Sequence, residues 1–143
     1  MTSKHLIPIA LLTLFPSLAK AQLNKSKGQV MQFMSNDSTL TFDKSSRTKD
    51  SFEFLSYSIP IKVLPDGHIA STTKVFYFFN DTCFLIKIIK PNNQLNNVIK
   101  DLNYRFVPMG DNIWFDEKEK AKYEIVLKEN DSVFTVQETP WKN

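Results

Sequence analysis

The fold of this chain is decided by the stretch from Lys74 to Lys90, which reads Lys-Val-Phe-Tyr-Phe-Phe-Asn-Asp-Thr-Cys-Phe-Leu-Ile-Lys-Ile-Ile-Lys. Aromatic and β-branched side chains dominate both halves of the stretch, as they do in β-strands. The pair Asn80-Asp81 between the halves has the short polar side chains that tolerate positive φ in tight turns. The stretch therefore predicts a central β-hairpin.

A two-residue loop at Asn80-Asp81 fixes which residues face one another across this hairpin. Counting outward from the loop places Phe78 opposite Cys83 and Tyr77 opposite Phe84. The two predicted faces carry Val75, Tyr77, Phe79, Phe84, Ile86 and Ile88 on one side, and Phe76, Phe78, Cys83, Leu85 and Ile89 on the other. Because both faces are apolar, we expect the hairpin in the middle of a sheet that is covered on both sides, or at an interface.

The segments around the hairpin predict an α+β fold with an antiparallel sheet of about six strands. Apolar side chains recur at three- and four-residue steps from Leu95 to Phe106, which predicts one main amphipathic helix over about residues 93–104. A short N-terminal helix is expected from Ser26 to Met34, with Ser26 as its N-cap. The further strands are expected at residues 39–42, 52–64, 112–116, 123–127 and 133–136, with a solvated loop at 43–51.

The order of these elements occurs twice along the chain. A helix, a short strand and two or three longer strands are expected from Ser26 to Ile89, and the same order returns from Gln94 to Val136. The sequence therefore predicts a duplicated helix-plus-meander unit. Pro108 and Gly110 are expected to stop any continuation of the main helix.

Residues 1–21 have the pattern of a cleaved signal peptide, because an apolar run is followed by the small-x-small sequence Ala19-Lys20-Ala21. The alternative is an uncleaved anchor, but that needs about 20 apolar residues, whereas this run is shorter and contains two prolines. Cleavage leaves residues 22–143 as a single α+β domain with a mobile tail from about residue 139. We therefore expect an exported protein, periplasmic or extracellular, with no transmembrane segment after leader cleavage.

Charge and cysteine content limit the classes of function. The chain has 18 basic and 15 acidic side chains, and Lys4 and Lys20 leave with the leader, so 16 basic groups face 15 acidic ones. A net charge near +1 gives no nucleic-acid footprint, and we expect no nucleic-acid partner. Cys83 is the only cysteine, so no intramolecular disulfide can form, and its thiol is expected to be a small buried hydrophobe.

Residues that carry catalytic chemistry are scarce. His68 is the only histidine after the leader, which excludes a zinc site with two or more histidines. A calcium site around Asp111, Asn112 and Asp116 lacks the spaced loop of carboxylates, so we expect neither a metal nor a cofactor. The three glycines are isolated and form no phosphate-binding loop, whereas hydrolysis by a carboxylate pair stays open because the acidic residues allow many pairs.

Two surface features remain. Three Asn-Asp-hydroxyl triplets, at Asn36, Asn80 and Asn130, match the N-glycosylation pattern, although turns between elements account for them as well. Amphipathic rings can anchor interfaces, so four aromatic side chains predict a recognition surface: Tyr57, Tyr104, Trp114 and Trp141. The alternative is that most of these rings fill a phenylalanine-rich core.

A resemblance rests on three segments: Tyr77 to Cys83 (Tyr-Phe-Phe-Asn-Asp-Thr-Cys), Leu95 to Phe106, and Gly110 to Asp116 (Gly-Asp-Asn-Ile-Trp-Phe-Asp). Together with a leader that ends Ala-Lys-Ala-Gln, they resemble short exported proteins of unassigned function that are frequent in Bacteroidota. The resemblance covers most of residues 22–143 and brings no catalytic residues. The order of helix and antiparallel sheet is also similar to that of small secreted inhibitor and envelope-assembly domains.

The leading hypothesis is a secreted or periplasmic, non-catalytic binding protein whose sheet recognises a protein or cell-envelope component. The alternative from another class is a small carboxylate-dependent hydrolase of the cell envelope, so the question of enzyme activity stays open. Self-association through the second apolar face of the hairpin is a third hypothesis. A sheet face with exposed aromatic rings favours binding, and a pocket with two or more convergent carboxylates favours the hydrolase.

Overall fold

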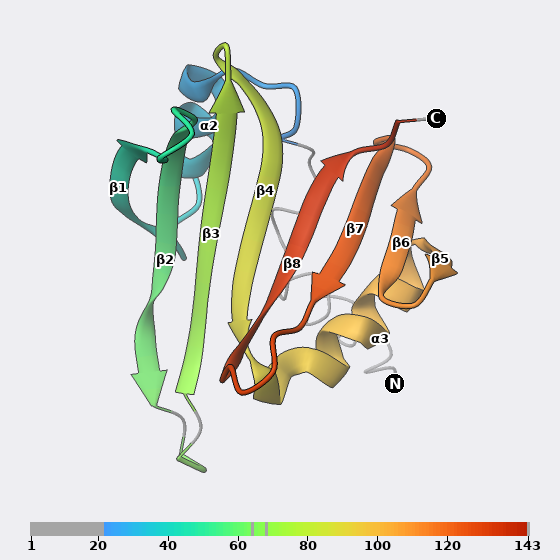
Figure 1. The fold of residues 1–143 in the computed structure, drawn as a ribbon. Coiled ribbons are helices and arrows are strands. Elements are labelled where there is room, and N and C mark those ends of the chain that lie inside the picture. Colours follow the sequence, from blue (N-terminus) through green and yellow to red (C-terminus); the bar gives the residue numbers. More distant parts are fainter. Residues whose placement is uncertain (1–21, 64, 68, 143) are drawn as a thin grey trace, which may run out of the picture.

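The structure, a computed structural model, describes residues 22–63, 65–67 and 69–142. The predicted leader and His68 lie outside the described residues. Eight strands form one antiparallel sheet in the order β1-β2-β3-β4-β8-β7-β6-β5, accompanied by two α-helices and one 3₁₀ turn (Figure 1). The elements are α2 (Lys27–Ser35), β1 (Thr41–Arg47), β2 (Glu53–Val63), β3 (Ile69–Phe79), β4 (Thr82–Pro91), η1 (Asn92–Gln94), α3 (Leu95–Arg105), β5 (Val107–Gly110), β6 (Ile113–Asp116), β7 (Ala121–Val126) and β8 (Val133–Pro140).

The predicted α+β class is confirmed, but the sheet has eight strands where about six were expected. β1 occupies most of the stretch that was predicted to be a solvated loop, and all of its residues are exposed. β5 forms at residues 107–110, where Pro108 and Gly110 were expected only to stop the helix. Both are the outer strands of the sheet, and an edge strand needs neither a buried face nor every backbone donor.

The end of the chain also differs from the prediction. β8 continues to Pro140, so Thr139 and Pro140 belong to the sheet, where they pair with Lys122 and Ala121 of β7. Trp141 follows directly, and its backbone N–H donates to the carbonyl oxygen of Lys120 at 2.8 Å. Hydrophobic periodicity missed this extension because Gln137, Glu138 and Thr139 are polar.

The central hairpin forms as predicted at its turn and differs beyond it. Asn80 and Asp81 have φ values of +48° and +59°, as a two-residue hairpin loop of this kind requires. Phe78 lies opposite Cys83, but Tyr77 then lies opposite Leu85, because Phe84 is an extra residue in a β-bulge. A shift of one residue exchanges the two faces of a strand. Consequently Ile86 and Ile88 share a face with Phe76, not with Tyr77 as predicted.

Two helix-plus-four-strand units build the sheet, which agrees with the predicted repeat. The first unit is α2 with β1 to β4, the second is α3 with β5 to β8, and the last strands of the two units pair at the centre. In each unit the turn of the last hairpin bonds to the start of the helix. Lys27 N–H donates to Asp81 Oδ1 at 3.1 Å, while Asn92 N–H donates to the Ser132 carbonyl at 2.9 Å and its Nδ2 to the Asp131 carbonyl at 2.6 Å.

The helices begin for local reasons and cover one face of the sheet. Ser26 and Gln29 form a reciprocal capping box at the start of α2, which confirms the predicted N-cap. The buried residues of α2 and α3 join one core cluster with a row of neighbouring sheet residues: Leu55, Phe76, Ile86, Glu138, Tyr123 and Trp114. These six side chains are 0–4% exposed. In Figure 1 both helices lie behind the sheet.

Candidate functional site

The helices of the described part of the chain leave the other face of the sheet uncovered (Figure 1). Its central row consists of the residues next to the buried row, which point the opposite way, and all six are half-buried: Phe54, Tyr77, Leu85, Thr139, Lys122 and Phe115. We call this surface the open face. It contains Tyr77 from one of the two apolar faces predicted for the hairpin, but Leu85 takes the place of Ile86 and Ile88 on it.

Aromatic rings pack against one another along the open face. Phe54 and Tyr77 have ring centroids 6.0 Å apart, and Phe115 and Trp141 have centroids 4.6 Å apart. The bulge adds Phe84, whose ring lies 5.1 Å from that of Phe52. Such ring contacts are worth about 0.5–1.5 kcal/mol each beyond the area that they bury, and they favour these relative orientations of the rings.

Lysine side chains lie over these rings. The Nζ atoms of Lys44, Lys87 and Lys120 are 5.9, 5.4 and 5.7 Å from the ring centroids of Phe54, Tyr77 and Phe115, respectively. Each distance is within the range of a cation–π contact, worth about 0.5–1 kcal/mol at exposed sites. The contacts keep ammonium groups on the aromatic surface.

The open face carries an excess of positive charge. Lys122 and Lys142 add two ammonium groups at its β8 end. Two carboxylates also belong to this face: Glu124, whose Oε2 lies 3.3 Å from Lys122 Nζ, and Asp43, which accepts hydrogen bonds from the hydroxyls of Ser56 and Ser58. A face of this composition attracts anions.

A groove opens where β4 and β8 separate. Their ladder ends at the pair Ile86 and Glu138, and the two strands diverge beyond it (Figure 1). The groove has a volume of about 490 Å³ and is lined by Phe84, Lys122, Thr139, Pro140, Trp141 and Lys142. We call it the end groove. Its position on the open face follows from Lys122 and Thr139, which belong to the central row.

The four predicted aromatic site residues do not share one surface. Trp141 lies on the open face against Phe115. Tyr57 and Trp114 are only 5% and 4% exposed and belong to the core, where Trp114 Nε1 donates to Asn103 Oδ1 at 2.8 Å. Tyr104 is 84% exposed but lies on α3, on the other side of the sheet. Whether any of them binds a ligand stays a prediction.

Three polar side chains meet inside the core where the two units join. Lys74 of β3 is 1% exposed, Glu138 of β8 is 2% exposed, and Tyr123 of β7 pairs directly with Glu138. Burial lowers the pKa of the Lys74 ammonium and raises the pKa of the Glu138 carboxyl, and each charge partly offsets the shift of the other. We call these three residues the junction cluster. It links the first unit to the second by charge.

The junction cluster brings two opposite charges into the core without a direct contact between Lys74 Nζ and Glu138 Oε1. Among the described residues none hydrogen-bonds to Lys74 Nζ, Glu138 Oε1 or the Tyr123 hydroxyl, and the Lys74 Nζ atom lies 5.1 Å from the ring centroid of Phe76. Burial also raises the pKa of the Tyr123 hydroxyl, and the neighbouring Glu138 charge raises it further. The Coulombic attraction between Lys74 and Glu138 is the largest effect that opposes their desolvation, and smaller contributions come from Tyr123 at Glu138 and from Asp37 at Lys74.

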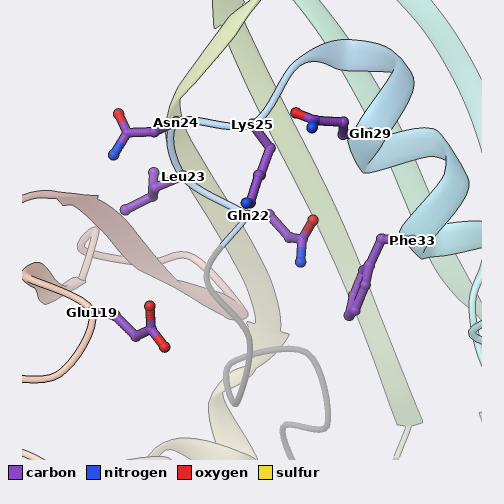
Figure 2. Close-up of a pocket in the computed structure, with 7 residues that line it drawn as sticks. All are labelled: Gln22, Leu23, Asn24, Lys25, Gln29, Phe33 and Glu119. Carbon is purple, nitrogen blue, oxygen red and sulfur yellow. The ribbon is translucent and has the colours of Figure 1, made fainter.

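A second cavity, of about 530 Å³, lies on the helix side of the sheet beside the first described residues (Figure 2). It is lined by Gln22, Leu23, Asn24, Lys25, Gln29, Phe33 and Glu119. The segment 22–25 is fixed to β4, since Asn24 N–H donates to the Cys83 carbonyl at 2.8 Å and Cys83 N–H to the Lys25 carbonyl at 2.9 Å. Among the described lining residues Glu119 is the one carboxylate, whereas a two-carboxylate hydrolase needs a pair.

The other candidate reactive groups have structural surroundings. Cys83 is fully buried, as predicted, and burial raises the pKa of its thiol to about 12. Asp116 Oδ1 accepts from the backbone N–H groups of Lys118 and Glu119, which is the capping of a turn. Within the described ranges, no three histidine, cysteine, aspartate or glutamate side chains form a group suited to a metal ion.

Comparisons of the chain with protein-family models, with curated proteins and with solved structures gave no match. None of the helices in the described part of the chain is both long and apolar enough to span a bilayer.

Sequence reasoning found the open face only indirectly. It predicted two apolar faces on the hairpin, yet it chose Tyr57 and Trp114 by residue type rather than by position. The signal that identifies Phe54, Tyr77 and Phe115 is their alternation with the most apolar core positions, Leu55, Phe76 and Trp114. That alternation can be read in β2, β3 and β6, but which side stays uncovered depends on where both helices pack.

Proposed function

We propose that this chain is an exported, non-catalytic binding protein and that the open face is its recognition surface. The observation that carries the proposal is a sheet face with half-buried rings at Phe54, Tyr77 and Phe115 and with lysines held over them. Exposed aromatic patches of this kind typically mark binding sites. Export rests on the signal-peptide pattern of residues 1–21.

The partner is an anionic protein or cell-envelope component. Lys44, Lys87, Lys120, Lys122 and Lys142 on one face favour acidic partners by charge complementarity. The same charge disfavours a second copy of this chain, because pairing two open faces would bring lysines together. A clean monomer at high concentration in sedimentation would agree with this choice.

Capture from a native cell-envelope extract tests the proposal, with residues 22–143 as bait. Lys87→Glu reverses a charge in the middle of the open face, and Lys100→Glu makes the same change on exposed α3, across the sheet. We expect Lys87→Glu to lose the captured partner and Lys100→Glu to keep it, and we expect capture to fall as salt rises. Equal capture by both variants would exclude the open face as the recognition surface.

An aromatic pair of variants separates ring contacts from charge. Tyr77→Ser removes a ring from the open face, whereas Tyr104→Ser removes the most exposed ring of α3. Loss of capture with Tyr77→Ser alone supports the proposal. Loss with Tyr104→Ser alone would move recognition to the helical side.

A further inference from the structure

We propose that the end groove binds a small amphipathic carboxylate, a molecule with an apolar body and one terminal carboxylate group. The inference deepens the proposed function, because it names a ligand chemistry for one end of the open face. It rests on that function only for its biological role, since binding in the groove can be measured by itself.

The size and lining of the end groove suit a small molecule. Its volume of about 490 Å³ is within the range of ligand pockets, roughly 300–1,000 Å³. Phe84, Pro140 and Trp141 supply apolar and aromatic walls, and Thr139 supplies a hydroxyl. Such a lining accepts an acyl or cyclic body and has few groups to satisfy a strongly polar one.

The walls of the groove are held in place by independent contacts. Trp141 packs on the ring of Phe115 at 4.6 Å, and its backbone N–H is bonded to the Lys120 carbonyl. Phe84 is turned into the groove by the β-bulge and packs on Phe52 at 5.1 Å. Two rings fixed on opposite strands therefore frame a preformed space, which lowers the entropy cost of binding.

The charged groups that line the groove favour a ligand with negative charge. Lys122 and Lys142 line it, and no carboxylate is among its described lining residues. Glu124 lies 3.3 Å from Lys122 Nζ and offsets part of its charge, yet both side chains are more than a third exposed at this end. Two ammonium groups beside apolar walls match a carboxylate on an apolar body, and they disfavour an amine of the same shape.

The two tryptophans make the test local. We would record the two indole N–H resonances of ¹⁵N-labelled chain 22–143 by NMR while adding 4-cyclohexylbutanoate. The expected result is a saturable shift of the Trp141 resonance with a Kd on the order of 1 mM or tighter for a ligand of this size. The Trp114 resonance, bonded to Asn103 in the core, should stay in place. Trp141→Phe assigns the resonances.

Matched ligands and variants define the outcome. The alcohol and the amine with the same cyclohexylbutyl body should bind at least about 10-fold more weakly, because charge-assisted bonds are lost or reversed. Lys122→Gln should weaken carboxylate binding about 3- to 10-fold, whereas Lys44→Gln, at the far end of the open face, should leave it unchanged. Urea unfolding of each variant shows that the fold is retained.

Several results would overturn the inference. The first three are an unshifted Trp141 indole resonance, a shifted Trp114 indole resonance, and binding of the alcohol as tight as that of the carboxylate. The fourth is binding only of a short peptide with a free C-terminal carboxylate, which would make the groove a site for polypeptide ends. If the carboxylate does not bind the end groove but Lys87→Glu still abolishes capture of the partner, the proposed function is retained and only the groove site is excluded. If the carboxylate binds the end groove but Lys87→Glu captures the partner as well as the parent does, the proposed function is excluded and the groove site is retained.

Discussion

Removing one of the two buried opposite charges, Lys74 and Glu138, should destabilise the protein far more than removing both. Lys74→Met and Glu138→Val each keep about the same side-chain volume, and both sites are at most 2% exposed, so each single variant leaves a buried charge without its partner. The remaining group can become neutral to stay buried. Neutralisation at pH 7 sets an upper limit on the added cost, because burial already shifts both pKa values in the parent. The limit is about 3.7 kcal/mol for Glu138, from an unfolded-state pKa of about 4.3, and about 4.6 kcal/mol for Lys74, from about 10.4.

These values agree with the roughly 3–5 kcal/mol that breaking a buried pair costs. The double variant should lie within about 1–2 kcal/mol of the parent, because an apolar pair of similar volume needs no charge compensation. Urea unfolding of the four proteins at pH 7 measures the free energies and gives the coupling. Lys100→Met, an exposed lysine on α3, is the matched control and should change the free energy by less than about 0.5 kcal/mol. Single variants that cost under about 1 kcal/mol each and add in the double variant would refute the reasoning.

The pH dependence gives the pair a second signature. The folded-state pKa of Glu138 is raised. Its contribution to the free energy of unfolding is therefore most favourable below the unfolded-state pKa of about 4.3, and it is lost as pH rises through the folded-state pKa. The folded-state pKa of Lys74 is lowered, so its contribution is most favourable above about 10.4 and is lost as pH falls. The cost of Lys74→Met should therefore shrink toward pH 4, and the cost of Glu138→Val toward pH 10. Parallel pH profiles for the two single variants would contradict a coupling between the two buried charges.

Three further outcomes are expected. Asp81→Ala should lower the free energy of unfolding by about 1–2 kcal/mol, because Asp81 has positive φ and its side chain accepts a hydrogen bond from the start of α2. Asp131→Ala is the control and should cost less than about 0.5 kcal/mol, because Asp131 accepts through its main-chain carbonyl. Equal losses of free energy in urea unfolding would count against this role of the Asp81 side chain. The Cys83 thiol should react with iodoacetamide at pH 8 at least about 100-fold more slowly in the folded than in the urea-unfolded chain, and comparable rates would contradict its burial. Mass spectrometry of the exported protein should find Gln22 as the first residue, and an intact leader would contradict the signal-peptide prediction.

Local sequence signals predicted the parts of the fold that local chemistry controls. The Asn80-Asp81 turn, the Ser26 cap and the spacing of apolar residues in α3 each depend on nearby residues, and each formed as expected. The β-bulge at Phe84 could not be read from the sequence, because both neighbouring residues are apolar and either register buries a similar surface. β1 is fully exposed, so its strand conformation comes from pairing with β2 rather than from a buried face.

The candidate site was less predictable, because it depends on where distant elements pack. Tyr57 and Trp114 have the residue types of recognition sites, yet they lie on the face that α2 and α3 cover. Glu138 was left outside the predicted strand 133–136 because it is polar, whereas the charge of Lys74 on another strand partly offsets the cost of its burial. Contacts between residues so far apart in the chain follow from the topology and cannot be inferred from periodicity.

The bonds between each hairpin turn and its own helix have a consequence for the order of assembly. Every contact of this kind closes within one unit, so both units can gain structure before they meet. Before the units pair, Lys74 of the first unit lacks the opposite charge of Glu138. Desolvating the Lys74 ammonium group is therefore unfavourable until the second unit brings Glu138 close to it. The core around Lys74 should therefore close only when the second unit pairs with the first. Pulsed hydrogen exchange during refolding should find the amides that bond β4 to β8 protected last, and early protection of those amides would exclude this order.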